Sequence, residues 1–227
     1  MNNFSTTSQS LDDWLSYLES IHPQNIELGL SRVKQVAKDL GLLEDLGYTL
    51  LVGGTNGKGS TCAYIEQLLL ASGVSTGVFS SPHIIRYNER VRINGNELAD
   101  DAHVQALRFI ELGRGDTTLT YFEFNTLAAL YLMKQAKVDC FILEVGLGGR
   151  LDSTNIVDAD MAVITTIDLD HQSWLGDTRE AVSFEKAGIF RNKQRVICGE
   201  PTPPQPMVDH AKSLDCQVSY KFKQFGF

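Results

Sequence analysis

The residues best suited to chemistry lie in one glycine-rich loop early in the chain. An apolar run ends there at two glycines, and a lysine and a serine follow before a helical pattern begins: Gly53-Gly54-Thr55-Asn56-Gly57-Lys58-Gly59-Ser60. Backbone N–H groups of such a loop, and the N-terminus of the helix after it, attract anions. Lys58 adds a full positive charge, and a hydroxyl beside it can reach a magnesium ion. The stretch predicts a phosphate-binding loop.

This loop departs from the standard phosphate-binding motif at one position. In that motif a serine or threonine follows the lysine directly, whereas Gly59 separates Lys58 from Ser60 here. Taken alone, the loop also fits a glycine-rich turn between a strand and a helix, with a solvated lysine. The rest of the chain must distinguish the two interpretations.

Apolar strand-like runs alternate with helical patterns along the chain, which predicts an α/β fold with a doubly wound, mainly parallel sheet. The strand-like runs are residues 48–52, 75–79, 138–145, 161–166, 195–198 and 217–220. Helical patterns cover residues 11–18, 30–40, 60–72, 101–112, 121–136, 178–189 and 207–214. In such sheets ligands bind beyond the carboxyl ends of the strands. The polar residues just past the strands are therefore the candidates for chemistry.

Three such polar residues follow or end successive strand-like runs. Ser81 follows the second run, Glu144 lies at the end of the third, and His171 follows the fourth. Magnesium prefers oxygen ligands and takes water for the remainder, so a metal site beside Lys58 is expected. A carboxylate in a buried strand needs a cation or a partner, and Arg150 is the alternative partner for Glu144. Taken alone, His171 fits a surface loop residue better than a metal ligand.

The composition limits the classes of protein that the chain can belong to. It has 227 residues, a net charge of −8, 43% apolar residues and 21% charged residues, as is usual for a globular protein. Nucleic acid is not an expected partner, because no basic cluster is present. No apolar run is long enough to cross a membrane, and the polar start lacks a secretion signal. The four widely spaced cysteines predict reduced thiols and a cytoplasmic location.

Six blocks of sequence occur in the order found in the folylpolyglutamate synthase family, within the Mur ligase superfamily, which the chain resembles. The blocks are residues 54–60, 80–83, 119–123, 144–152, 170–171 and 185–189. Gly59, unusual for a standard loop, is the form that this family carries. The resemblance extends over residues 14–206 and implies a Mur ligase-like ATPase domain with a phosphate-binding loop.

The resemblance implies an ATP-dependent ligase. In the family, a carboxylate of dihydropteroate or tetrahydrofolate attacks the γ-phosphate of ATP, and the amine of L-glutamate displaces phosphate from the acyl phosphate. The residues implied to hold ATP are Thr55, Asn56, Gly57, Lys58, Gly59 and Ser60. One or two Mg²⁺ ions would be held by Ser81, Glu144, His171 and a carbamylated Lys186. Lys58, His171 and Lys186 would be catalytic, although Lys186 by its sequence context is a solvated helix lysine.

The resemblance also implies a binding site for the pteroate part of the substrate. Its residues would be Leu28, Thr120, Tyr121, Phe122, Glu123, Leu151, Asp152 and Ser153. Asp152 suits the amino-pyrimidine edge of a pterin, and Phe122 suits stacking on its ring. Residues 81–92 match a loop near the active site of the family.

Members of the family run to about twice the length of a typical single domain, and their C-terminal domain completes the ATP site and supplies the glutamate site. We therefore expect residues 1–227 to form the N-terminal ATP-binding domain, incomplete at its C-terminal end, without the glutamate ligase domain. A monomer that is inactive alone is expected. Two alternatives are a peptidoglycan Mur ligase, which lacks the 119–123 block, and a nucleotide-binding module without catalysis.

Overall fold

The computed structural model describes residues 10–22 and 27–226, which form an α/β fold around one sheet. Within these residues the sheet has eight strands in the order β4-β3-β2-β5-β1-β6-β7-β8. All neighbours pair in parallel except β2 with β3 and β3 with β4. The predicted mainly parallel sheet is confirmed. The strands are β1 Tyr48–Gly53, β2 Thr76–Phe79, β3 Val91–Ile93, β4 Asn96–Glu97, β5 Cys140–Glu144, β6 Met161–Ile164, β7 Arg195–Cys198 and β8 Gln217–Tyr220.

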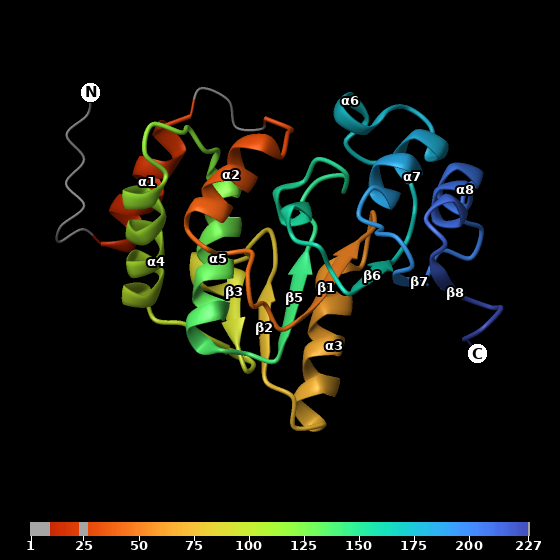
Figure 1. Cartoon of the computed structure of the whole chain (residues 1–227), viewed down its shortest axis with the longest axis horizontal. Coiled ribbons are helices and arrows are strands. Elements are labelled where there is room, and N and C mark those ends of the chain that lie inside the picture. The colour runs from red at the N-terminus through yellow and green to blue at the C-terminus, as the bar shows by residue number, and fades with distance from the viewer. Residues whose placement is uncertain (1–9, 23–26, 227) are drawn as a thin grey trace.

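Helices cover both faces of this sheet (Figure 1). They are α1 Leu11–Ser20, α2 Ser31–Asp39, α3 Lys58–Ala71, α4 Asp100–Gly113, α5 Tyr121–Ala136, α6 Gln172–Leu175, α7 Arg179–Ala187 and α8 Gln205–Ser213, with 3₁₀ turns at Tyr87–Arg90 and Ser153–Ile156. Each helix is too short or too polar to cross a bilayer along the described part of the chain. Capping boxes at Ser10–Asp13 and Thr120–Glu123 begin α1 and α5, as their sequences predict.

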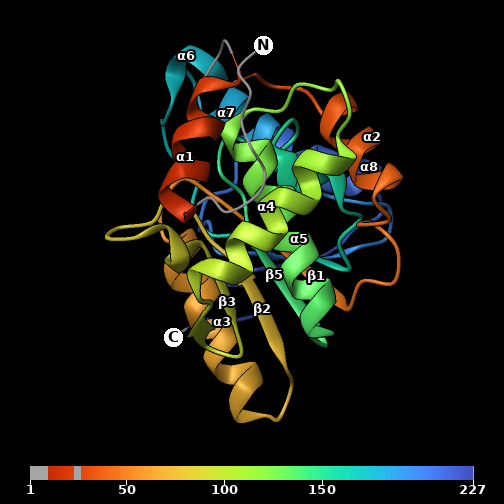
Figure 2. The same ribbon diagram turned by 90° about the vertical axis from the view of Figure 1, so that its left-hand side faces the viewer.

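Alternating strand residues divide the core into two clusters. In β5, Phe141 and Leu143 join the cluster that contains buried residues of α1, α2, α4, α5, α7 and α8. Cys140 and Ile142 join a smaller cluster with Cys62 of α3. Because successive side chains of a strand point to opposite faces, α3 covers one face and the other helices cover the second. Figure 2 shows α4 and α5 in front of β1, β2 and β5.

The carboxyl ends of four neighbouring strands lie at one edge of the sheet. Val52 of β1 pairs with Glu144 of β5, and Gly53 pairs with Ile164 of β6. Phe79 of β2 pairs with Leu143. The loops after these strands therefore start side by side, and they carry the residues that the sequence singles out.

Candidate functional site

The phosphate loop has a backbone that favours glycine at two positions. Gly54 has φ +141, and a Cβ there would lie 1.9 Å from Thr165 Oγ1. Gly57 has φ +81 and is the N-cap of α3. This backbone makes residues 58–60 the first turn of α3, whose N–H groups have no acceptor within the helix. The loop thus presents open donors and a helix N-terminus to an anion.

The segment after β6 holds this loop in place. Thr55 Oγ1 and the backbone of Asp168 exchange two hydrogen bonds of 3.0 Å. Thr165 Oγ1 donates to the Asn56 carbonyl at 2.7 Å, and Asn56 N–H donates to Thr166 Oγ1 at 3.0 Å. Thr55 is buried and Asn56 is exposed. The Thr55 side chain and the Asn56 backbone thus contact the segment after β6, while the following turn faces outward.

Lys58 has a defined position over the loop. Its Nζ donates to the carbonyl oxygens of Gly54 at 3.0 Å and Thr55 at 3.2 Å. The same charge opposes the rise in the pKa of the buried Glu144 carboxyl and, being a like charge, contributes to the lowered pKa of Lys186. Lys58 therefore stands among the loop, the end of β5 and α7, as a cation that neutralises phosphate should.

Glu144 is buried at the end of β5 without a cationic hydrogen-bond partner in the described residues. It is 4% exposed, and its Oε2 accepts a hydrogen bond of 3.2 Å from the Ser81 N–H. Burial raises the pKa of this carboxyl, and the Ser81 N–H and the Lys58 charge oppose that rise. The alternative of an Arg150 partner is wrong, because Arg150 pairs with Glu185 at 2.9 Å.

Glu144 and Ser81 together fit a divalent cation that takes few ligands from the protein. No three His, Cys, Asp or Glu side chains gather into a metal cluster among the residues that the structure describes. Mg²⁺, however, is commonly held by one or two carboxylates together with substrate phosphates and water. The Glu144 carboxylate lies near the first turn of α3, since a Cβ on Gly59 would be 3.5 Å from its Oε2. Glu144 and the Ser81 hydroxyl thus have the oxygen donors that such an ion requires.

Lys186 is not the solvated lysine that its sequence context predicts. It is 3% exposed on α7, and burial is the largest cause that lowers its pKa to about 8, followed by the charge of Lys58. Asp170 and Asp152 lie close enough to oppose this shift. At pH 7 about a tenth of such amines are neutral, and a neutral amine is the form that reacts with CO₂ to give a carbamate.

His171 lies at the outer rim of this region. It is the N-cap of α6 with φ 46, and its side chain is 53% exposed. Its one ion pair among the described residues is with Asp170, at 3.7 Å. Asp170 also lies near Lys186. His171 and Lys186 therefore share Asp170 as an acidic neighbour, whereas Ser81 and Glu144 are joined to each other directly.

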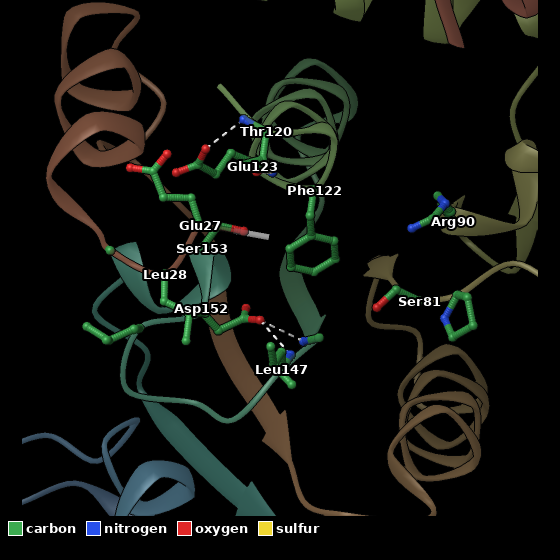
Figure 3. A pocket seen from close by; sticks show the side chains of 14 residues that line it. Glu27, Leu28, Ser81, Arg90, Thr120, Phe122, Glu123, Leu147, Asp152 and Ser153 are labelled. Atoms are coloured by element: carbon green, nitrogen blue, oxygen red, sulfur yellow. Dashed lines mark hydrogen bonds between the residues drawn. The ribbon is translucent and has the colours of Figure 1, made fainter. Parts of the chain in front are cut away.

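A cavity of about 280 Å³ lies beside the phosphate loop (Figure 3). Seven of the eight residues implied for pteroate binding line it: Leu28, Thr120, Phe122, Glu123, Leu151, Asp152 and Ser153. Tyr121 is the exception, because it is not among the lining residues and packs under Arg90 instead. The residues that sequence reasoning did not select are Glu27, Gly29, Pro82, Arg90, Gly146 and Leu147.

Asp152 forms one polar wall of the cavity. Its Oδ2 accepts from the N–H groups of Gly146 at 3.0 Å and Leu147 at 2.8 Å, as the dashed lines in Figure 3 show. Its Oδ1 accepts from Thr154 N–H and Oγ1 at 2.9 and 2.6 Å. Burial raises the pKa of this carboxyl against these hydrogen bonds. Asp152 is therefore rigidly held with a buried acceptor facing the cavity.

Arg32 joins two further acidic residues of the cavity wall. Its Nη1 pairs with Glu27, and its Nη2 lies 3.2 Å from both carboxylate oxygens of Glu123. Glu123 also accepts from the Thr120 N–H at 2.8 Å in the capping box of α5. The α2 helix is thereby tied to the start of α5, and the Glu123 charge is neutralised.

Ser81 belongs to both halves of the site. Its N–H donates to Glu144, and the residue lines the cavity. Gly146, only two residues after Glu144, lines the cavity as well. The phosphate loop and the cavity are therefore adjacent regions of one site, and a ligand of the cavity would have its near end at Ser81.

Residues 52–201 match the protein-family model of the Mur ligase middle domain. The match covers more than half of the chain, and it begins in β1, immediately before the phosphate loop. The chain belongs to the Mur ligase middle-domain family.

Within this family the chain is similar to dihydrofolate synthase/folylpolyglutamate synthase. It is 57% identical to the Haemophilus influenzae protein over 220 residues, which cover 96% of this chain and 50% of that one. It is 55% identical to the Escherichia coli protein over 202 residues, which cover 89% and 48% of the two chains. The chain thus spans about half the length of the curated relatives it matches.

Solved structures of relatives have the same fold. The structure of E. coli FolC in complex with DHPP and ADP superposes with a TM-score of 0.94 at 52% identity, covering 96% of this chain and 53% of that one. The structure of a bifunctional folylpolyglutamate synthase/dihydrofolate synthase with Mn, AMPPNP and L-glutamate bound superposes with a TM-score of 0.90 at 54% identity. The match covers 96% of this chain and 53% of that one. The resemblance predicted from the six sequence blocks is confirmed.

Proposed function

We propose that this chain provides the ATP site and the pteroate site of a ligase. The ligase joins L-glutamate to dihydropteroate, giving dihydrofolate, and to tetrahydrofolate, giving its polyglutamates. The observation that carries this proposal is the position of Ser81, which lines the cavity and donates to Glu144 beside the phosphate loop. A carboxylate at that end of the cavity would lie next to the γ-phosphate that it must attack. The family membership and the similar relatives support the same reaction.

In the proposed reaction the chain's own residues bind and orient the two reacting groups. The N–H groups of residues 57–60 hold the phosphates, and Lys58 neutralises the charge that builds on the transferred phosphoryl group. Glu144 and the Ser81 hydroxyl would hold a divalent ion, for which we propose Mg²⁺, and the ion would supply charge neutralisation for the phosphates. Lys186 as a carbamate would provide a further anionic ligand, and His171 would contact a metal.

The carboxylate of the substrate forms a bond to the γ-phosphorus while the bond to ADP breaks. The α-amine of L-glutamate then attacks the acyl carbon, loses a proton and releases phosphate. We propose that the glutamate site is contributed by the additional length that the relatives have, with residues 1–227 as the N-terminal ATP-binding domain. The chain acts as a monomer in the cytoplasm in this proposal.

Calorimetric titration of the purified chain tests the assignment. AMPPNP with Mg²⁺ is expected to bind, and K58A is expected to lose about tenfold or more in affinity, because a charge-assisted hydrogen bond is worth roughly 1.5–3 kcal/mol. K212A, at an exposed lysine of α8, is the matched control. Unchanged AMPPNP affinity in K58A would overturn the proposal.

Two further measurements distinguish the alternatives. Dihydropteroate is expected to bind the chain, whereas saturation by a peptidoglycan nucleotide-sugar precursor, with no response to dihydropteroate, would favour a peptidoglycan Mur ligase. Binding without turnover is expected for residues 1–227. Sustained release of dihydrofolate from ATP, glutamate and dihydropteroate by this chain alone would refute the need for a second domain.

A further inference from the structure

Arg90 is a buried cation in the wall of the cavity. It ends the 3₁₀ turn Tyr87–Arg90 and is only 8% exposed. It lines the cavity together with Ser81 and Phe122. Figure 3 shows its guanidinium directed into the cavity, on the side opposite Asp152 and Glu27. The charge of Arg90 therefore faces the space that a ligand would fill.

The partners of this guanidinium are neutral. Its Nε donates to His83 Nδ1 at 2.8 Å, and its Cζ lies 5.5 Å from the centroid of the Tyr121 ring. Because His83 Nδ1 accepts this hydrogen bond it carries no proton, and the imidazole is therefore the neutral form. Arg90 has no carboxylate within 4.0 Å in the described part of the chain, unlike seven other arginines: Arg32, Arg86, Arg92, Arg114, Arg150, Arg179 and Arg191.

An uncompensated buried charge is unfavourable, and an anion that arrives with the ligand offsets the cost. The fixed acceptor of the Asp152 carboxylate forms the opposite wall. Glu27 and Glu123 lie on that side too, but Arg32 neutralises them. A ligand with hydrogen-bond donors at one end and an anionic group at the other matches this arrangement. Its anionic end would then lie beside Arg90 and Ser81, on the phosphate side of the site.

We propose that Arg90 binds the carboxylate of the pteroate substrate and orients it toward the phosphate loop. This assignment rests on the proposed function and specifies the direction in which the substrate lies. The planar guanidinium has two parallel N–H donors that match both oxygens of a carboxylate, which a lysine ammonium does not. Arg90 is thus a substrate-binding residue that selects a carboxylate-bearing pterin over a neutral one.

Calorimetric titration of the full 227-residue chain with two ligands tests this proposal. Dihydropteroate carries the carboxylate, and 6-hydroxymethyl-7,8-dihydropterin carries only the pterin head. R90M is expected to lower the affinity for dihydropteroate roughly 10- to 100-fold, as expected for the loss of a hydrogen bond to a charged group. Its affinity for the pterin alcohol is expected to stay unchanged. The dihydropteroate affinity of R90K is expected to lie between those of R90M and the wild type. R86M, an exposed arginine of the same loop, is the matched control.

The ratio of the two affinities within one protein is independent of the fraction that is folded, so it remains informative if R90M is less stable. A ratio in R90M equal to that of the wild type would refute the role of Arg90 while leaving the proposed function intact. If the wild type bound neither pterin, the proposed function itself would fail. An equal change of the ratio in R86M would show a general charge effect and would also overturn the proposal.

Discussion

The buried ammonium of Lys186 gives a prediction about stability. The pKa of this lysine is lowered from 10.5 to about 8, with burial as the main cause. That difference, at about 1.4 kcal/mol per pKa unit, corresponds to about 3 kcal/mol of destabilisation of the protonated folded state. Replacing Lys186 by methionine, which has a similar length and no charge, is expected to stabilise the protein by about that amount near neutral pH.

The direction in which stability changes with pH follows from the pKa of Lys186, which is about 8 in the folded chain and 10.5 in the unfolded chain. Below about pH 8 both the folded and the unfolded chain carry the proton, so the penalty is complete. Between about pH 8 and 10.5 the unfolded chain binds more protons, so the free energy of unfolding rises with pH. The advantage of K186M over the wild type is therefore expected to shrink by about 2 kcal/mol between about pH 7 and pH 9.5.

Urea unfolding of both proteins at these two pH values, in buffer depleted of CO₂, measures this change. The comparison between variants removes contributions from other groups that titrate in the same range. K212M is the matched control, because water surrounds this exposed side chain of α8. A difference between K186M and the wild type that does not vary with pH would refute the argument for a lowered pKa.

Two further predictions concern Glu144 and Thr120. E144Q is expected to weaken Mg²⁺-dependent AMPPNP binding about tenfold or more, since it removes the buried charge that would hold the ion; titration with and without Mg²⁺ measures this. An equal loss of AMPPNP affinity in the absence of Mg²⁺ would contradict a metal-binding role for Glu144. E111Q, on α4, is the control variant. T120A is expected to cost about 1–2 kcal/mol of unfolding free energy, because it removes a buried helix cap. S10A, at an exposed helix cap, is expected to lower the free energy of unfolding by less than T120A in the same urea experiment. An equal decrease in the two variants would contradict the argument that burial strengthens the Thr120 cap.

Local sequence signals were sufficient to predict most of the fold. Apolar runs and capping boxes depend on nearby residues, and the main helices and six of the eight described strands, all except β3 and β4, lie within the predicted runs or close to them. The rule that ligands bind beyond parallel strands correctly placed the loops after β1, β2, β5 and β6 at one edge. The α6 helix was not predicted, because four residues, Gln172–Leu175, show no helical period.

Lys186 and Arg90 show why the site was only partly predictable. The buried face of α7 contains Val182, Ser183, Lys186 and Ala187, so its helical period did place the lysine inward. Residue type argued the other way, since lysine is rarely buried. The role proposed for Arg90 depends on the absence of a carboxylate near it within residues 10–22 and 27–226, which is a tertiary property without a local sequence signal.

The double role of Ser81 has a thermodynamic consequence. This residue and Pro82 line the cavity, and the Ser81 N–H fixes the carboxylate that would hold the metal. Any ligand that shifts this short segment changes the free energy of binding on its other side. Such coupling is reciprocal, so under the proposed function any effect of nucleotide on pterin affinity would equal the effect of pterin on nucleotide affinity. The phosphate loop and the cavity would then bind their ligands as one linked equilibrium through Ser81 and Pro82.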